Sequence, residues 1–322
     1  MILQRLMLMT GVFGTAILAA GSVAGQSFPS KPIRIFTAAV GGGVDFAARS
    51  VAQGITAPLG QQVVVENRGG SAAVSAEQVA KSAPDGHTLL MYGSGFWMTP
   101  LLQDNVRYDP VRDFLPVVLT SSAPNVLVVN PVLPVKSVRE LIALAKSRPG
   151  ELNYATSGTG SSGHLASELF KSMAGINIKR INYKGSAQGL TDLVSGEVQL
   201  GFSNAATTTP FLKSGRLRAL AVGSAERSLL VPGVPTIAES GVPGYEAVSV
   251  IGLFAPAKTP ANIIARLNQE VVRVLTQPDV KERFLSNGAE AMGGTPEHLD
   301  QKIKGEIARM GKVIKEGGIR GE

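Results

Sequence analysis

The chain has 322 residues, of which 44% are hydrophobic and 17% charged, enough for about two packed domains. It contains no cysteine, which excludes disulfides, thiolate metal sites and a cysteine nucleophile. Its three histidines are far apart in the sequence, so we expect no metal site. The formal charge is +7, but the basic residues are dispersed and only one Trp and five Tyr are present. A basic stripe with stacking aromatics is therefore missing, and we expect no nucleic-acid partner.

Residues 1–24 have the pattern of an export signal. Arg5 precedes the apolar run Leu6–Ala20, and the small residues Ser22 and Ala24 follow it. The alternative is a membrane anchor, but the run is shorter than the ~20 residues that a spanning helix needs. We expect cleavage after Ala24 and a mature protein in the periplasm.

The next segment predicts a β-α-β-α-β unit. Apolar periodicity and Gly or Pro breaks indicate strands and helices in alternation. The strands are expected at 32–37, 62–66 and 88–92, and the helices at 46–55 and 72–82.

The same pattern recurs further along the chain. Strands are expected at 152–155, 176–183 and 198–202, and helices at 164–174 and 187–194, with Gly175 ending the first helix. Strands that alternate with helices favour parallel sheets covered on both faces.

Two apolar segments, 124–131 and 248–254, connect the two units. Ser137 and Glu140 form a capping box at a helix start, and Pro260 and Pro296 each follow a Thr at the start of a later helix. We predict a two-lobe α/β clamshell of the type II-like periplasmic binding-protein class, each lobe a mainly parallel sheet flanked by helices, with two crossing strands. Lobe 1 is expected at 25–125 plus 249–322, and lobe 2 at 126–248.

Two glycine-rich loops, 38–45 and 157–164, follow the first strand of each unit. Open α/β sheets bind ligands at this edge, and glycine amides at a helix N-terminus form an anion site. Neither loop contains Arg or Lys, so a carboxylate would be held by backbone and hydroxyl donors. Asp45 is the one acid in the first loop, and capping of the helix is the alternative role for it.

The second loop allows two other interpretations. Residues 158–163 match G-x-G-x-x-G, but the acid expected about 20 residues further on is missing. His164 with Ser161 and Glu168 could serve an exported α/β hydrolase or oxidoreductase, although no G-x-S-x-G elbow exists. We favour a His164 that braces the loop, and the enzyme remains the alternative.

The sequence resembles the substrate-binding proteins of tripartite tricarboxylate transporters, the Bug family. The resemblance covers about Phe28 to Ala291, and many stretches match in order. They include Phe28–Arg34, Gly41–Asp45, Val65–Gly70, Pro84–Leu90, Tyr108–Pro110, Asn153–His164, Tyr183–Gly185, Gly215–Val222 and Thr259–Pro260.

The resemblance implies a periplasmic receptor that binds a small anionic carboxylate and serves the membrane subunits of such a transporter, with no catalytic residue, metal or cofactor. We expect it to be a monomer. The ligand contacts that it implies are Ala39, Gly41, Gly42, Gly43, Asp45, Ser94, Gly95, Phe96, Ser157, Gly158, Thr159, Gly160, Ser161, His164, Ser203, Asn204, Ala205 and Thr207.

The chain departs from the family pattern at three places. Thr37–Val40 replaces Pro-Phe-Ala-Pro, His87 replaces a Tyr, and Asn182 replaces a Pro. The loss of the family's Phe at Ala38 reshapes the expected pocket wall and leaves the identity of the carboxylate open.

Overall fold

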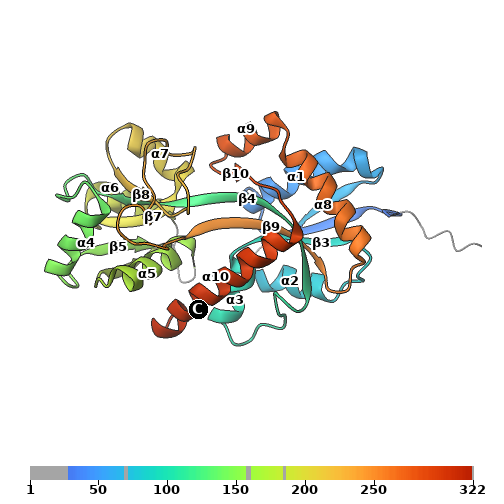
Figure 1. Ribbon diagram of the computed structural model, residues 1–322, viewed down its shortest axis with the longest axis horizontal. Helices are drawn as coiled ribbons and strands as arrows, with labels where there is room; N and C mark the ends of the chain where they lie inside the picture. The colour runs from blue at the N-terminus through green and yellow to red at the C-terminus, as the bar shows by residue number, and fades with distance from the viewer. Residues whose placement is uncertain (1–27, 69–71, 157–160, 184–185, 321–322) are drawn as a thin grey trace, which may run out of the picture.

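The protein folds into two lobes joined by long strands (Figure 1). The computed structural model describes residues 28–68, 72–156, 161–183 and 186–320. The export signal predicted at residues 1–24 and the loop positions 157–160 therefore lie outside the described residues.

Lobe 1 is built around a three-stranded parallel core. β1 (Ile33–Thr37) lies between β2 (Val63–Asn67) and β3 (Thr88–Gly93). The sheet is covered by α1 (Gly43–Leu59), α2 (Ala72–Ala80) and α3 (Gly95–Leu102). Ile35 packs with the α1 side and the neighbouring Phe36 with the α2 and α3 side, because successive side chains of a strand point to opposite faces.

Lobe 2 repeats this arrangement, as the sequence predicted. β5 pairs in parallel with β6 and β7, and helices cover the sheet. Its elements are α4 (Val138–Ser147), β5 (Asn153–Thr156), α5 (Ser162–Ala174), β6 (Lys179–Asn182), α6 (Ser186–Ser195), β7 (Leu200–Asn204), α7 (Ala205–Lys213) and β8 (Arg218–Val222).

Two strands cross between the lobes. β4 (Phe114–Val129) pairs with β9 (Val248–Pro256) up to Pro124 and with β7 and β8 from Asn125 onwards. Because both crossing strands join antiparallel to their neighbours, the sheet as a whole is mixed, and only the core of each lobe is parallel. We propose lobe boundaries at 125/126 and 248/249, within one residue of the change of partner in β4 and of the start of β9.

The C-terminal elements return to lobe 1 and then run along the crossing strands. They are α8 (Ala261–Leu275), α9 (Pro278–Ser286), β10 (Glu290–Ala291) and α10 (Pro296–Glu316). α10 contacts α3 and β4 and also α5 of lobe 2 (Figure 1). Its buried residues Leu299, Ile303 and Met310 join one hydrophobic cluster that contains Trp97 of lobe 1 and Phe170 of lobe 2. The last helix therefore packs on both sides of the hinge.

The predicted caps have mostly the expected geometry. Ser137 Oγ accepts a hydrogen bond from the Glu140 amide, and the Glu140 carboxylate accepts from the Lys136 amide. Gly175 ends α5 with a left-handed φ of 60°. Pro260, however, is the N-cap of α8 and not its first residue. The sequence prediction also missed α3, α7 and α9, which are short and begin or continue through Gly or Pro.

Candidate functional site

One cavity of the protein lies between the lobes. This inter-lobe cavity has a volume of about 310 Å³. It is lined from lobe 1 by Val44, Ser94 and Gly95, and from lobe 2 by Ser161 and Ser162. Val44 lies in the first turn of α1, and the other four lie at the starts of α3 and α5. Three helix N-termini thus surround one cavity, and each contributes a partial positive charge of roughly +0.5.

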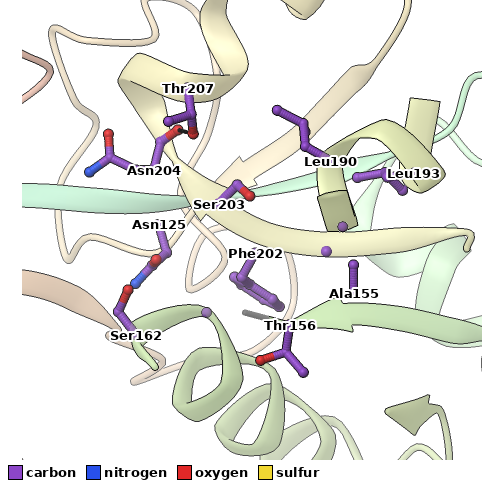
Figure 2. A pocket seen from close by; sticks show the side chains of 13 residues that line it. Asn125, Ala155, Thr156, Ser162, Leu190, Leu193, Phe202, Ser203, Asn204 and Thr207 are labelled. Carbon is purple, nitrogen blue, oxygen red and sulfur yellow. Dashed lines mark hydrogen bonds between the residues drawn. The ribbon is translucent and has the colours of Figure 1, made fainter. Parts of the chain in front are cut away.

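A neighbouring cavity of about 170 Å³ lies within lobe 2, beside β5, β7 and α6. It shares Asn125 and Ser162 with the inter-lobe cavity. Figure 2 shows these two side chains pointing toward one another, with Ser203 and Thr207 on the other side of Asn125. Asn125 is on the crossing strand β4, and its amide donates to the Ala247 carbonyl at 3.2 Å. The two cavities therefore meet at the hinge.

The glycine loop before α1 is braced by Asp45. Its carboxylate accepts from the Gly41 amide at 2.9 Å and from Asn67 Nδ2 at 2.7 Å, and it lies 3.0 Å from Arg49 Nε. Burial raises the pKa of Asp45, but these donors lower it more, and the net pKa lies below its usual value. Asp45 is buried and holds the loop through these contacts. The N-cap residue of α1 is Gly42, which has no side chain with which to cap the helix.

The loop itself is open. Gly41 has a φ of +86°, which favours glycine, and a Cβ on Gly41 or Gly43 would meet no atom within 4 Å. Within the described residues the Gly42 amide donates no hydrogen bond. The loop thus has backbone and space available for a ligand, although Val44 is the residue of this loop that lines the inter-lobe cavity.

The start of α5 is held by Ser161. Its Oγ accepts from the His164 amide at 3.3 Å and lies 3.2 Å from Thr156 Oγ1. Gly163 lies directly against β7, where a Cβ would come within 2.5 Å of the Phe202 carbonyl oxygen. These contacts fix the N-terminus of α5 at the edge of both cavities.

His164 is buried behind the site and lines neither cavity. Burial and then the charge of Arg180 lower the pKa of His164 to about 4, so the ring is neutral at pH 7. Its Nε2 lies 3.4 Å from Arg180 Nη1. Glu168, which would have to orient it in an enzyme, accepts from Tyr154 Oη and from Lys171 Nζ. The structure thus gives His164 a place in the packing of lobe 2.

The predicted contacts divide into three groups. The cavities are lined by Ser94, Gly95, Ser161, Ser203, Asn204 and Thr207. The residues that do not line them are the exposed Ala39, Gly41, Gly42 and Gly43 and the buried Asp45, Phe96, His164 and Ala205. Ser157, Gly158, Thr159 and Gly160 lie outside the described residues.

Phe96 has a specific reason for its position. It packs among Trp97, Tyr108, Phe114 and Phe254, and no side-chain surface remains for a ligand. We assign it to the lobe 1 core.

Charged residues of the inter-lobe cavity were missed in the sequence. Glu306 and Arg309 come from α10, and Glu246 from the segment before β9. Glu306 accepts from Trp97 Nε1 at 3.0 Å, and burial raises its pKa. Glu246 is paired with Lys302, and its Oε2 lies 3.6 Å from Arg309 Nη1. No local pattern marks them, because α10 reaches the cavity only through the tertiary fold.

The sequence matches a known family of receptors over most of its length. The model of the tripartite tricarboxylate transporter family receptor matches residues 47–319. The chain belongs to this family of receptors. Its members are periplasmic solute receptors rather than enzymes.

Similar proteins span nearly the whole receptor chain. Protein BugT of Bordetella pertussis is 37% identical over 99% of both chains. The solved structure of Rpa4515 from R. palustris with adipate has 39% identity and a TM-score of 0.74, covering 92% of this chain and all of that one. MatC from Rhodopseudomonas palustris with bound malate has 32% identity and a TM-score of 0.71, covering 89% and 100%.

The described part of the receptor has neither a cluster of metal-ligating side chains nor a membrane-spanning helix. Among its residues no group of three or more His, Asp or Glu side chains could hold a metal ion. None of its helices combines the length and the apolar character needed to cross a bilayer.

Proposed function

We propose that this receptor captures a small carboxylate in the periplasm and delivers it to the membrane subunits of a tripartite tricarboxylate transporter. The observation that carries the proposal is the inter-lobe cavity, which is surrounded by the N-termini of α1, α3 and α5. Backbone amides and the dipoles of helix N-termini favour an anion there. The adipate and malate in the two similar structures are carboxylates.

The binding mode follows from the donors available. One carboxylate of the ligand is held by backbone amides and by the hydroxyls of Ser94, Ser161 and Ser162. Each such charge-assisted bond contributes about 1.5–3 kcal/mol, so several are enough for micromolar affinity. Rotation of the lobes about β4 and β9 then encloses the ligand.

The test is a thermal-shift and calorimetry screen of the mature chain against small mono- and dicarboxylates. We expect one or a few of them to raise the Tm and to bind with a stoichiometry of one per monomer. A screen in which no carboxylate binds would contradict the proposal.

We also propose that the receptor has no catalytic activity and no resident cofactor or metal. The neutral, buried His164 and the engagement of Glu168 by Tyr154 and Lys171 support this. Incubation of the bound carboxylate, or of its methyl ester, with the receptor should return it unchanged. Turnover would favour the hydrolase or oxidoreductase alternative.

We also propose that the protein is exported with removal of residues 1–24 and that the mature receptor is a monomer. Cleavage after Ala24 predicts an N-terminus at Gly25 or Gln26, which mass spectrometry of periplasmic protein would detect. Retention of residues 1–24 in a membrane fraction would contradict it. We expect the mature receptor to elute as a monomer and to bind no nucleic acid.

A further inference from the structure

Arg309 is the one cationic side chain among the described residues that line the inter-lobe cavity and the lobe 2 cavity. It lies on α10, on the side of the inter-lobe cavity formed by the C-terminal helix. Its side chain is 30% exposed. The guanidinium has five N–H donors, yet it donates no hydrogen bond to a described residue, and its buried Nε has no partner there.

The acids near Arg309 leave its donors available. Glu246 lies 3.6 Å away, which is longer than a hydrogen bond, and its carboxylate is already in contact with Lys302. Glu306 accepts from Trp97, on the side of α10 that faces α3. A partly buried guanidinium without hydrogen bonds is unfavourable unless another acceptor reaches it.

Part of the wall of the inter-lobe cavity is apolar. Leu165, Ala166, Val248 and Met310 line it. Such a wall suits methylene groups, whereas the helix N-termini and Arg309, which line the same cavity, suit negative charge.

We propose that Arg309 binds a second carboxylate of the ligand, so that the receptor selects linear dicarboxylates over monocarboxylates of equal length. This inference rests on the proposed function, since it assumes that one carboxylate lies at the helix N-termini. A planar guanidinium can form two parallel hydrogen bonds to a carboxylate. A methyl group at the same position would leave the guanidinium unsatisfied.

The experiment uses two matched pairs of probes, succinate with butanoate and adipate with hexanoate. Affinities are measured by calorimetry on the mature wild-type chain, R309Q, R309K and K302Q. Lys302 is the matched control, because it is on the same helix, pairs with the same Glu246 and does not line the cavity.

For at least one pair, the wild type should bind the dicarboxylate about tenfold or more tightly than the monocarboxylate. Arg309→Gln should remove this preference by weakening the dicarboxylate about 10- to 100-fold, with less than about threefold change for the monocarboxylate. Arg309→Lys should keep part of the preference, because it keeps the charge. Lys302→Gln should keep all of it.

Four results would overturn the inference. Equal wild-type affinity for both members of each pair would do so without any variant, even if R309Q failed to fold, and would leave the proposed function intact. An equal loss for both members in R309Q, or the same loss in K302Q, would show an effect of the ion pairs on the hinge. Binding of none of the four probes would overturn the inference, and failure of the wider screen as well would contradict the proposed function.

Discussion

Gly288 of lobe 1 lies directly on Ala206 of lobe 2, so that a Cβ on Gly288 would come within 2.1 Å of the Ala206 Cβ. Gly288 follows α9, and Ala206 lies in the first turn of α7. Close by in the chain, Ser228 Oγ donates to Glu290 of β10. The lobes therefore touch through a second set of contacts besides the crossing strands and α10, and this set lies on the α7 side of the molecule (Figure 1).

This contact predicts that Gly288→Ala lowers carboxylate affinity. The added methyl holds the lobes apart, because the atoms that it would meet include the backbone Cα and N of Ala206, which cannot move aside as a side chain could. We expect a loss of about threefold to tenfold, measured by calorimetry, since lobe closure contributes to affinity only if the lobes can meet.

Gly60→Ala is the matched control for this variant. Gly60 has a φ of +66°, close to the +73° of Gly288, so both substitutions introduce the same left-handed strain. A Cβ on Gly60, however, would meet no atom within 4 Å. Gly60→Ala should lower the Tm similarly and leave affinity unchanged; equal affinities in the two variants would contradict a role of the Gly288 contact in closure.

We expect substitution of Asp45 to reduce both the stability of the protein and its affinity for carboxylate. Asp45→Ala removes the carboxylate that accepts from the Gly41 amide and from Asn67 and that pairs with Arg49. We expect unfolding in urea to show about 1–3 kcal/mol lower stability, with weaker carboxylate binding because the loop loses its shape. Full affinity in the variant would mean that the loop keeps its shape without the brace.

The repeat of the β-α-β-α-β unit made the two lobes and the position of their loops predictable from sequence. Strand alternation, glycine breaks and the Ser137 cap are local signals, and they place the ends of β1 and β5 at the site. The side chains that lie there depend on packing that local patterns do not report. Phe96 was expected at the ligand but completes an aromatic cluster, and Arg309 reaches the cavity because α10 crosses the hinge.

We expect a substitution of Gly163 to destabilise lobe 2 alone. A Cβ there would lie 2.5 Å from the Phe202 carbonyl oxygen, which is backbone and cannot rotate away. Gly163→Ala should therefore push α5 from β7 and lower stability by about 1–3 kcal/mol. Hydrogen exchange should show faster opening of α5 and β7 than of α1 and β1, whereas uniform acceleration would argue against a local effect.

We expect His164 to make the stability of the protein depend on pH, and we expect its replacement to remove this contribution. Its pKa is about 4 in the folded protein, because burial and Arg180 disfavour the charged ring, against about 6.5 in an unfolded chain. Between pH 6.5 and pH 4 the unfolded state therefore binds a proton that the folded state does not, and stability falls as the pH is lowered through this range. Asn has no titrating ring but keeps a donor and an acceptor.

His164→Asn should therefore show a smaller decrease in the free energy of unfolding between pH 7 and pH 4 than the wild type. At pH 7 it should bind carboxylate with at most about tenfold lower affinity, the equivalent of one hydrogen bond. Urea unfolding at a series of pH values measures the first effect and calorimetry the second. Identical pH profiles would show that the ring is not held neutral by its surroundings, and a turnover present in the wild type but lost in the variant would make His164 a catalytic base.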